Sequence, residues 1–257
     1  TGAAVAVVVE ATASRLMTRT AVLNVLARPR APERMASLRL VSLIHFYMPL
    51  GLTSLIALSI QPIVTFFMGQ SRFALESLAV LPVIHGLTFI FRAIGLSYLE
   101  VAIALLGKRR EHFAKLRNFA YLLAVISTAG LSAIAFTPLN EIWFHTISGL
   151  TLTLTAFARL PIQVLAIFPT LSVGLHLMRA VLVHAHQTRP ITWATVAELL
   201  TVTGVLVITI GNMDLVGAVA ASVAILVGRI VGVAWLFPAS RTILNAEPNP
   251  VGTVTVS

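Results

Sequence analysis

Residues 118–138 read NFAYLLAVISTAGLSAIAFTP and contain no charged side chain. A helix of about 20 apolar residues crosses the hydrocarbon core of a bilayer, so this stretch predicts a transmembrane helix. Six further apolar segments lie on either side of it, at 2–27, 40–69, 74–107, 150–185, 191–212 and 214–237. The sequence therefore predicts an all-α, polytopic membrane protein with about seven transmembrane helices.

The composition of the chain agrees with a place in a membrane. Of its 257 residues, 58% are hydrophobic and only 11% are charged, and the mean hydropathy is +0.94. Soluble domains carry roughly 25% charged residues, and disordered chains are biased toward charge. The composition therefore excludes both a soluble globular domain and a disordered chain.

Two of the segments, 74–107 and 150–185, are longer than the bilayer is thick. We expect such helices to tilt, kink or project beyond the membrane. Proline interrupts the hydrogen bonds of a helix, so Pro82, Pro161 and Pro169 are the expected kink positions.

Basic residues predict the orientation of the chain. Lys and Arg number 18 against 9 Asp and Glu, which gives a net charge of +9. Most of the basic residues were assigned to the connections that follow the first, third, fifth and seventh segments: Arg28, Arg30, Arg34, Arg39, Lys108, Arg109, Arg110, Lys115, Arg117, Arg179, Arg189 and Arg241. Because basic loops stay in the cytoplasm, the pattern places the N-terminus outside and the C-terminus in the cytoplasm. This pattern accounts for the charge without a nucleic-acid partner.

The densest basic cluster is Lys108, Arg109 and Arg110. One interpretation is that it determines topology. The other is that it contacts anionic lipid head groups, which attract clustered Lys and Arg beside a membrane. Both interpretations can hold together.

Several chemistries are excluded by the absence of the residues they need. The chain has no cysteine, so disulfides, Cys-ligated zinc and iron–sulfur clusters are excluded. It has no phosphate-binding loop, HExxH or GxSxG motif. Asp214 is the only aspartate, and Lys108 and Lys115 are the only lysines, so paired aspartates and a retinal Schiff base in the last helix are also excluded. The histidines show no metal-binding spacing, and we expect neither an enzyme nor a cofactor.

The first and last segments share a pattern of small residues. GAAVA at 2–6 and GAVAA at 217–221 are each followed about a dozen residues later by an arginine, Arg15 and Arg229. Small residues at this spacing let helices pack closely. They are equally consistent with a duplicated half, as many transporters have.

A resemblance to a known family is carried by HFYMPL (45–50), QPIVTFF (61–67), ESLAVL (76–81), LPIQ (160–163) and FP (168–169). Over residues 40–237 the sequence resembles the multidrug/oligosaccharidyl-lipid/polysaccharide (MOP) exporter superfamily, and within it the progressive ankylosis protein family. The resemblance implies a C-terminal six-helix bundle of a twelve-helix transporter of anionic solutes. Gln61 and Gln163 stand where the resemblance implies arginines. The two neutral side chains lack the positive charge that would attract those anionic substrates.

The resemblance also implies a division of the chain. Residues 1–27 would be the last helix of a truncated N-terminal half, 28–39 a cytoplasmic basic linker, 40–237 the six-helix bundle and 238–257 a cytoplasmic tail. The chain begins at Thr1 without Met, so we expect a piece of a longer protein or a processed one. The missing N-terminal half is then an expected partner, and the chain alone is expected to be unstable or oligomeric.

Charged residues within the apolar segments are the candidate functional residues, because a charge at the bilayer centre costs about 2.5 kcal/mol or more and tends to mark a pathway. They are Glu10, Arg15, Glu76, Arg92, Glu100, Arg159, Glu198 and Arg229. Arg92 is interpreted as a substrate-pathway residue or as a structural partner. Glu76 is placed to pair with Arg72. Glu100 lies roughly 12 Å along the helix from Arg92, too far for a salt bridge.

Glu198, already named, and two glutamines complete the candidate set. Glu198 is interpreted as a bonded or snorkelling carboxylate, or as a proton or cation acceptor. Gln61 precedes Pro62 and is expected to line a cavity, because proline leaves a backbone carbonyl without its helical partner. Gln163 is assigned to the substrate pathway with Arg92 and Gln61.

The function expected from these features is secondary transport or export of an anionic or amphipathic solute by alternating access, in a plasma or bacterial inner membrane. The alternatives are a lipid-linked oligosaccharide flippase and a non-transporting membrane scaffold. A polar cavity would favour transport, whereas a dry and tightly packed bundle would favour the scaffold.

Overall fold

The computed structural model describes residues 8–9, 11–19, 23, 40–106 and 111–245, without the side chains of 40–47, 49 and 50. The chain divides into two units, Thr1–Ile44 and His45–Ser257. In the first unit residues 8–9, 11–19 and 23 are helical. The remainder of the expected 2–27 helix lies outside the described residues, as do Glu10 and the small residues at 2–6.

The described part of the second unit is built from helices. They are α2 (Leu40–Met68, which begins in the first unit), α3 (Ala74–Leu105), α4 (Phe113–Phe136), α5 (Leu139–Glu141), η1 (Ile142–Ile147), α6 (Leu152–Val164), η2 (Leu165–Ile167), α7 (Phe168–His184), α8 (Arg189–Leu206), η3 (Val207–Asn212) and α9 (Gly217–Asn245). Six helical segments among the described residues are long and apolar enough to cross a membrane. This confirms an all-α fold of the membrane type.

Two helices extend beyond the predicted apolar segments into turns that contain charged residues. The segment expected at 118–138 begins at Phe113, and the last helix continues through Pro238 to Asn245. Hydropathy marks the apolar part of a helix, whereas the hydrogen-bonded helix extends into charged turns that contain Lys115 or Arg241. The first residues of the expected 238–257 tail are therefore helical.

The long segment at 150–185 is interrupted at its middle. Pro161 lies in α6 and Pro169 in the first turn of α7, and the 3-10 turn Leu165–Ile167 separates the two helices. The break therefore falls between the two prolines that were expected to kink the segment. By contrast, α3 continues past Pro82 as one helix.

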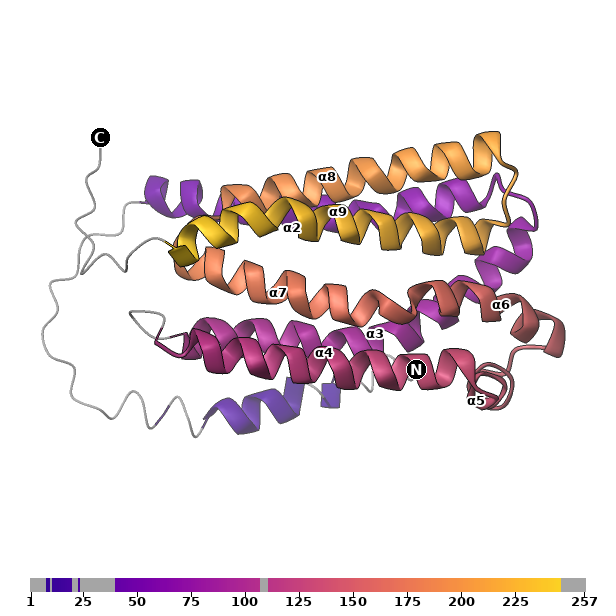
Figure 1. Cartoon of the computed structure of the whole chain (residues 1–257), viewed down its shortest axis with the longest axis horizontal. Coiled ribbons are helices and arrows are strands. Elements are labelled where there is room, and N and C mark those ends of the chain that lie inside the picture. Colours follow the sequence, from indigo (N-terminus) through magenta and orange to yellow (C-terminus); the bar gives the residue numbers. More distant parts are fainter. Residues whose placement is uncertain (1–7, 10, 20–22, 24–39, 107–110, 246–257) are drawn as a thin grey trace, which may run out of the picture. The chain divides into compact units, whose positions relative to one another are not determined.

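The connections of the second unit alternate between the two ends of the bundle (Figure 1). At one end the α2–α3 turn meets the α8–α9 turn through a bridge between Arg72 and Val216. The hydroxyl of Ser77 accepts a hydrogen bond of 3.1 Å from the Ala218 N–H. We call these contacts the turn junction. Phe73 joins this end to α6 through an edge-to-face contact with Phe157.

Helix α2 packs against its neighbours mainly near the turn junction. Val64 and Met68 are its buried apolar residues among the described side chains, and they join a cluster with Leu81, Leu206 and others. Farther along α2, Thr53 forms a hydrogen bond of 2.8 Å with Thr192 of α8. Polar contacts thus replace apolar packing along this part of α2.

Candidate functional site

A cavity of about 580 Å³ lies among α2, α3, α7, α8 and α9, close to the midpoints of α2 and α3. Much of its lining is apolar, including Leu58, Leu165, Phe168 and Val202. Its polar and charged lining residues are Gln61, His85, Thr88, Arg92, His176, Arg179, Thr195, Glu198 and Arg229. The cavity therefore combines an apolar wall with a dense polar group inside helices of membrane-spanning length.

Four charged side chains reach the cavity from four different helices. Arg92 comes from α3, Arg179 from α7, Glu198 from α8 and Arg229 from α9. Arg229 Nη2 lies 3.1 Å from Glu198 Oε1, and this is the ion pair among the residues that the structure describes. Three arginines against one glutamate leave two positive charges uncompensated when the histidines are neutral. The cavity is therefore electropositive.

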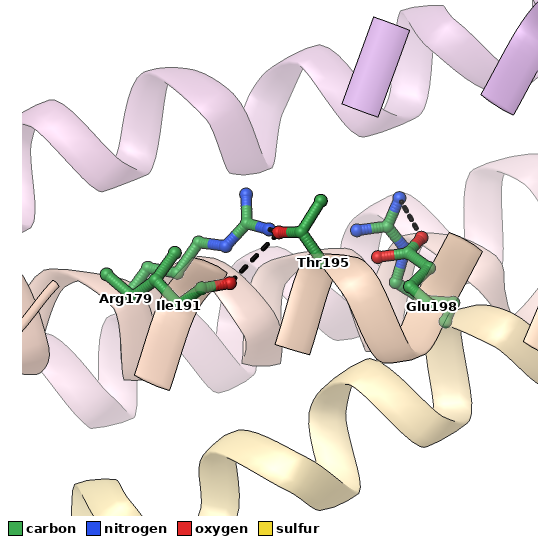
Figure 2. A network of polar contacts seen from close by, with 5 residues as sticks. Arg179, Ile191, Thr195 and Glu198 are labelled. Atoms are coloured by element: carbon green, nitrogen blue, oxygen red, sulfur yellow. Dashed lines mark hydrogen bonds and ion pairs between the residues drawn. The ribbon is translucent and has the colours of Figure 1, made fainter. Parts of the chain in front are cut away.

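Arg179 is positioned by a hydroxyl on the neighbouring helix (Figure 2). Its Nη2 donates to Thr195 Oγ1 at 3.3 Å, and that hydroxyl donates to the Ile191 carbonyl at 3.0 Å. Glu198 follows Thr195 by three residues, so the two side chains share one face of α8. One face of α8 thus presents a partner to Arg179 and a partner to Arg229.

Among the described residues, several nitrogen atoms of the basic side chains around the cavity are buried and have no hydrogen-bond partner. Within the described chain, the Nε atoms of Arg92, Arg179 and Arg229 are buried without a hydrogen-bond partner, and so is Nδ1 of His176. Buried polar atoms are rarely left in this state unless water, an ion or a ligand binds them. The side chains that carry these atoms line one cavity, and their excess of cationic groups over the single carboxylate suits the cavity to an oxygen-rich, negatively charged group.

Aromatic rings support two of the arginines. The Arg92 guanidinium carbon lies 5.4 Å from the centre of the Phe89 ring, and that of Arg229 lies 5.0 Å from the Phe168 ring. Cation–π contacts of this kind hold a guanidinium in place without neutralising its charge. The two arginines therefore retain their attraction for an anion.

Gln61 and His85 connect the two helices at the edge of the cavity. The Gln61 amide nitrogen lies 3.1 Å from His85 Nδ1, so the amide donates and the imidazole nitrogen accepts. Both side chains line the cavity. The expected cavity-lining position of Gln61 therefore agrees with the structure.

Glycines bring the backbones of the site close together. A Cβ on Gly228 would lie 2.6 Å from Val202 Cγ2 and 3.2 Å from the Glu198 carbonyl oxygen, so α9 packs directly against α8. A Cβ on Gly95 would lie 3.3 Å from His176 Cδ2, which brings α3 equally close to α7. Small residues thus allow the approach that places these charged side chains around one space.

The structure brings together some of the sequence-predicted residues and not others. Arg92, Gln61, Glu198 and Arg229 line one cavity. Gln163 does not, because its amide donates to the Ala135 carbonyl of α4 at 3.3 Å. Glu100 and Arg159 are exposed side chains away from the cavity, and Arg15 is an exposed residue of the first unit.

Two further predictions about charged residues have different outcomes. Arg72 and Glu76 form no ion pair in the described structure, and the Arg72 guanidinium instead lies over the Phe73 ring. The basic cluster of Lys108, Arg109 and Arg110 lies outside the described residues.

The sequence interpretation missed Arg179, His85, His176 and Thr195. Arg179 was assigned to the basic connection after the fifth segment, but α7 continues to His184 and places Arg179 more than one turn inside the helix. The assignment of Arg179 to that connection was wrong, because Arg179 lies within the predicted segment 150–185 and within α7 itself. Its spacing from His176 on one helix face was the signal available.

No group of three histidine, aspartate or glutamate side chains suited to a metal ion occurs among the described residues. Comparisons of the chain with protein-family models, with curated proteins and with solved structures found no match. The chemistry of the cavity is therefore the basis for a functional proposal.

Proposed function

We propose that this protein is a secondary membrane transporter that binds an anionic or amphipathic solute in the arginine-lined cavity. The observation that carries the proposal is the excess of positive charge: Arg92, Arg179 and Arg229 face a single carboxylate, Glu198. Charges within a membrane protein are costly and usually serve a pathway or binding site. An anion would compensate the remaining charge and accept hydrogen bonds from the guanidinium groups that line the cavity.

The lining also supports an amphipathic solute. Leu58, Leu165, Phe168 and Val202 provide apolar surface beside the charged group. Ligand sites are commonly apolar with a few placed polar groups, and a volume of about 580 Å³ falls in the usual range of about 300–1,000 Å³. A solute with an anionic end and an apolar body would satisfy both parts of the lining.

A charged cavity favours transport over a scaffold, because a scaffold gains nothing from placing three arginines around a single carboxylate. In this proposal the bundle works by alternating access within the MOP superfamily, with the N-terminal half that the resemblance implies as the opposing bundle. The basic connections face the cytoplasm of a plasma or bacterial inner membrane.

The proposal is tested by anion flux in liposomes containing the reconstituted protein. We expect saturable uptake of amphipathic organic anions. Arg92→Gln should reduce this uptake by more than about tenfold, the effect of losing roughly 1.4 kcal/mol of binding. Arg159→Gln is the matched control, because Arg159 is exposed and does not line the cavity. Absence of uptake of every anion, or equal uptake by Arg92→Gln and Arg159→Gln, would contradict the proposal.

A further inference from the structure

Glu198 is the acidic residue of the cavity lining. It binds Arg229, the arginine with which a bound anion would also interact. Its carboxylate lies 3.1 Å from Arg229, and both side chains line the cavity. Glu198 is only 5% exposed, whereas the cavity that it borders is large enough for a small organic molecule. The carboxylate thus already fills one anion-binding position of the site.

The surroundings of Glu198 favour an exchange of its negative charge for that of a ligand. Arg229 of α9 contacts it, Arg179 of α7 is bound to Thr195 one turn earlier on α8, and the charges of Arg92 and Arg179 both interact with it. His85 of α3 and His176 of α7 are the other titratable groups of the lining, and α2 contributes the neutral Gln61. Every neighbouring helix except α2 therefore presents a cation or a histidine to this region.

We infer that Glu198 competes with the transported anion for Arg229 and takes up a proton when the anion binds. The inference rests on the proposed anion-binding function and adds its coupling to protons. The anion replaces the carboxylate on the Arg229 guanidinium, and a hydronium ion of the solvent gives up one O–H bond to protonate the carboxylate, which leaves a neutral carboxylic acid and a water molecule. No bond other than the carboxyl O–H bond forms, and the proton is carried with the anion.

The physical reason is repulsion between two negative charges that share one cationic group. Within a protein such repulsion is weakly screened, and the proton removes it. Coupling between two ligands is reciprocal, so anion binding favours protonation of Glu198 and acid conditions favour anion binding. The protein would accordingly accumulate anions on the side of a membrane to which protons flow.

The alternative role for the pair is structural. Glu198 and Arg229 would then only hold α8 against α9, at the place where Gly228 allows the helices to approach. A structural pair predicts that removal of the carboxylate lowers thermal stability and weakens or leaves unchanged the binding of an anion. The competing-carboxylate role predicts tighter binding, which separates the two.

The test uses naphthalene disulfonate as the probe, because both sulfonates stay ionised over the whole range and the charge of the ligand is constant. Its affinity for the protein in lipid nanodiscs is measured by calorimetry at about pH 5.5 and about pH 8, which bracket the titration of an ordinary histidine. The variants are Glu198→Gln, which keeps the size of the side chain, and Glu100→Gln, an exposed carboxylate outside the cavity. Repetition in buffers of different ionisation enthalpy counts the protons taken up.

We expect the unmodified protein to bind the probe about tenfold more tightly at the lower pH, with proton uptake, as a coupling of ordinary size gives. Glu198→Gln should bind at the higher pH as tightly as the unmodified protein does at the lower pH, without proton uptake. Glu100→Gln should match the unmodified protein. If Glu198→Gln does not fold, a His85→Gln/His176→Gln double variant decides the question: pH dependence and proton uptake that persist in it support Glu198 as the titrating group, and their loss overturns the inference.

Weaker binding by Glu198→Gln, or a pH dependence that persists in it, would overturn the inference, since the histidines would then carry the titration. Binding by the unmodified protein that is equal at both pH values would overturn it as well, while leaving the anion site intact. Absence of binding at both pH values would contradict the proposed function itself. The two failures are therefore distinguishable.

Discussion

A Cβ atom on Gly232 would lie 3.3 Å from Oε2 of Glu198, so the backbone of α9 passes directly beside the carboxylate that binds Arg229. Gly228 lies one turn earlier on the same face of α9. The charged centre of the cavity thus depends on two positions without side chains. Substitutions there affect the packing of α8 and α9 and the geometry of the ion pair together.

Gly228→Ala is expected to destabilise the protein, because its new Cβ would lie only 2.6 Å from Val202 Cγ2 and would force α8 and α9 apart. Overpacking of this kind costs about 1–3 kcal/mol. Thermal unfolding in detergent, followed by tryptophan fluorescence, measures the loss. Gly204→Ala on α8 is the matched control, since nothing lies within 4 Å of its new Cβ. A melting temperature that falls equally in both variants would contradict the prediction.

Thr195→Val is expected to weaken anion binding about three- to tenfold and to lower stability modestly. The substitution keeps the size of the side chain and removes the oxygen that receives the 3.3 Å bond from Arg179. A hydrogen bond to a charged group contributes about 1.5–3 kcal/mol, and without it the Arg179 guanidinium is no longer held in the position from which it meets a ligand. Calorimetry with naphthalene disulfonate measures the change.

The matched control for Thr195→Val is Thr201→Val, on the same helix. The Thr201 hydroxyl bonds the Ala197 carbonyl of its own helix and does not line the cavity. Unchanged affinity in both variants would show that Thr195 does not position Arg179 for a ligand.

Ala57→Cys should react with a membrane-impermeant thiol reagent, because Ala57 lines the cavity. Val125→Cys should not, since Val125 is an exposed residue of the apolar helix α4 and would face lipid. A thiol reacts as the thiolate, which requires water. The chain has no native cysteine, so each variant carries a single target. Mass spectrometry of the labelled protein in proteoliposomes gives the result, and labelling of Ala57→Cys that is as low as that expected of Val125→Cys would mean that the cavity excludes water.

Ser77→Ala should destabilise the turn junction. The Ser77 hydroxyl accepts the 3.1 Å bond from the buried Ala218 N–H, and its loss leaves that donor without a side-chain partner. An unsatisfied buried donor costs about 1–3 kcal/mol. Hydrogen exchange of the amides in 216–220 measures local opening, which we expect to be faster than in the unmodified protein. Ser240→Ala serves as the control, because its hydroxyl bonds only a carbonyl of its own helix, that of Phe237. Exchange that stays at the unmodified rate would contradict the role of Ser77.

Much of the helical fold could be predicted from the sequence because a bilayer demands long apolar helices, and such helices are visible in hydropathy. The ends were less accurate. The helix around 118–138 begins earlier, at Phe113, and the last helix ends later, at Asn245. Charged turns belong to these helices but resemble loops in composition.

The site was predictable only in part. Arg92, Glu198 and Arg229 were visible as charges within apolar segments, because such charges are rare there. The pairing of Glu198 with Arg229 was not visible, since it depends on the rotation of two helices and on the close approach at Gly228. Gln163 had the expected chemistry but binds the Ala135 carbonyl, because the orientation of α6 turns it toward α4.

The packing of α2 has a mechanical consequence. Its buried apolar residues, Val64 and Met68, form a pivot, whereas the bonds Gln61–His85 and Thr53–Thr192 hold the helix beside the cavity. Thr53 lies about 16 Å along the axis from Val64, at 1.5 Å per residue, so a rotation of about 10° about Val64 would displace it by roughly 3 Å. That displacement is enough to exchange a hydroxyl partner for water while the apolar contacts at the pivot stay in place. A small reorientation of α2 about these apolar contacts would therefore change the width of the site.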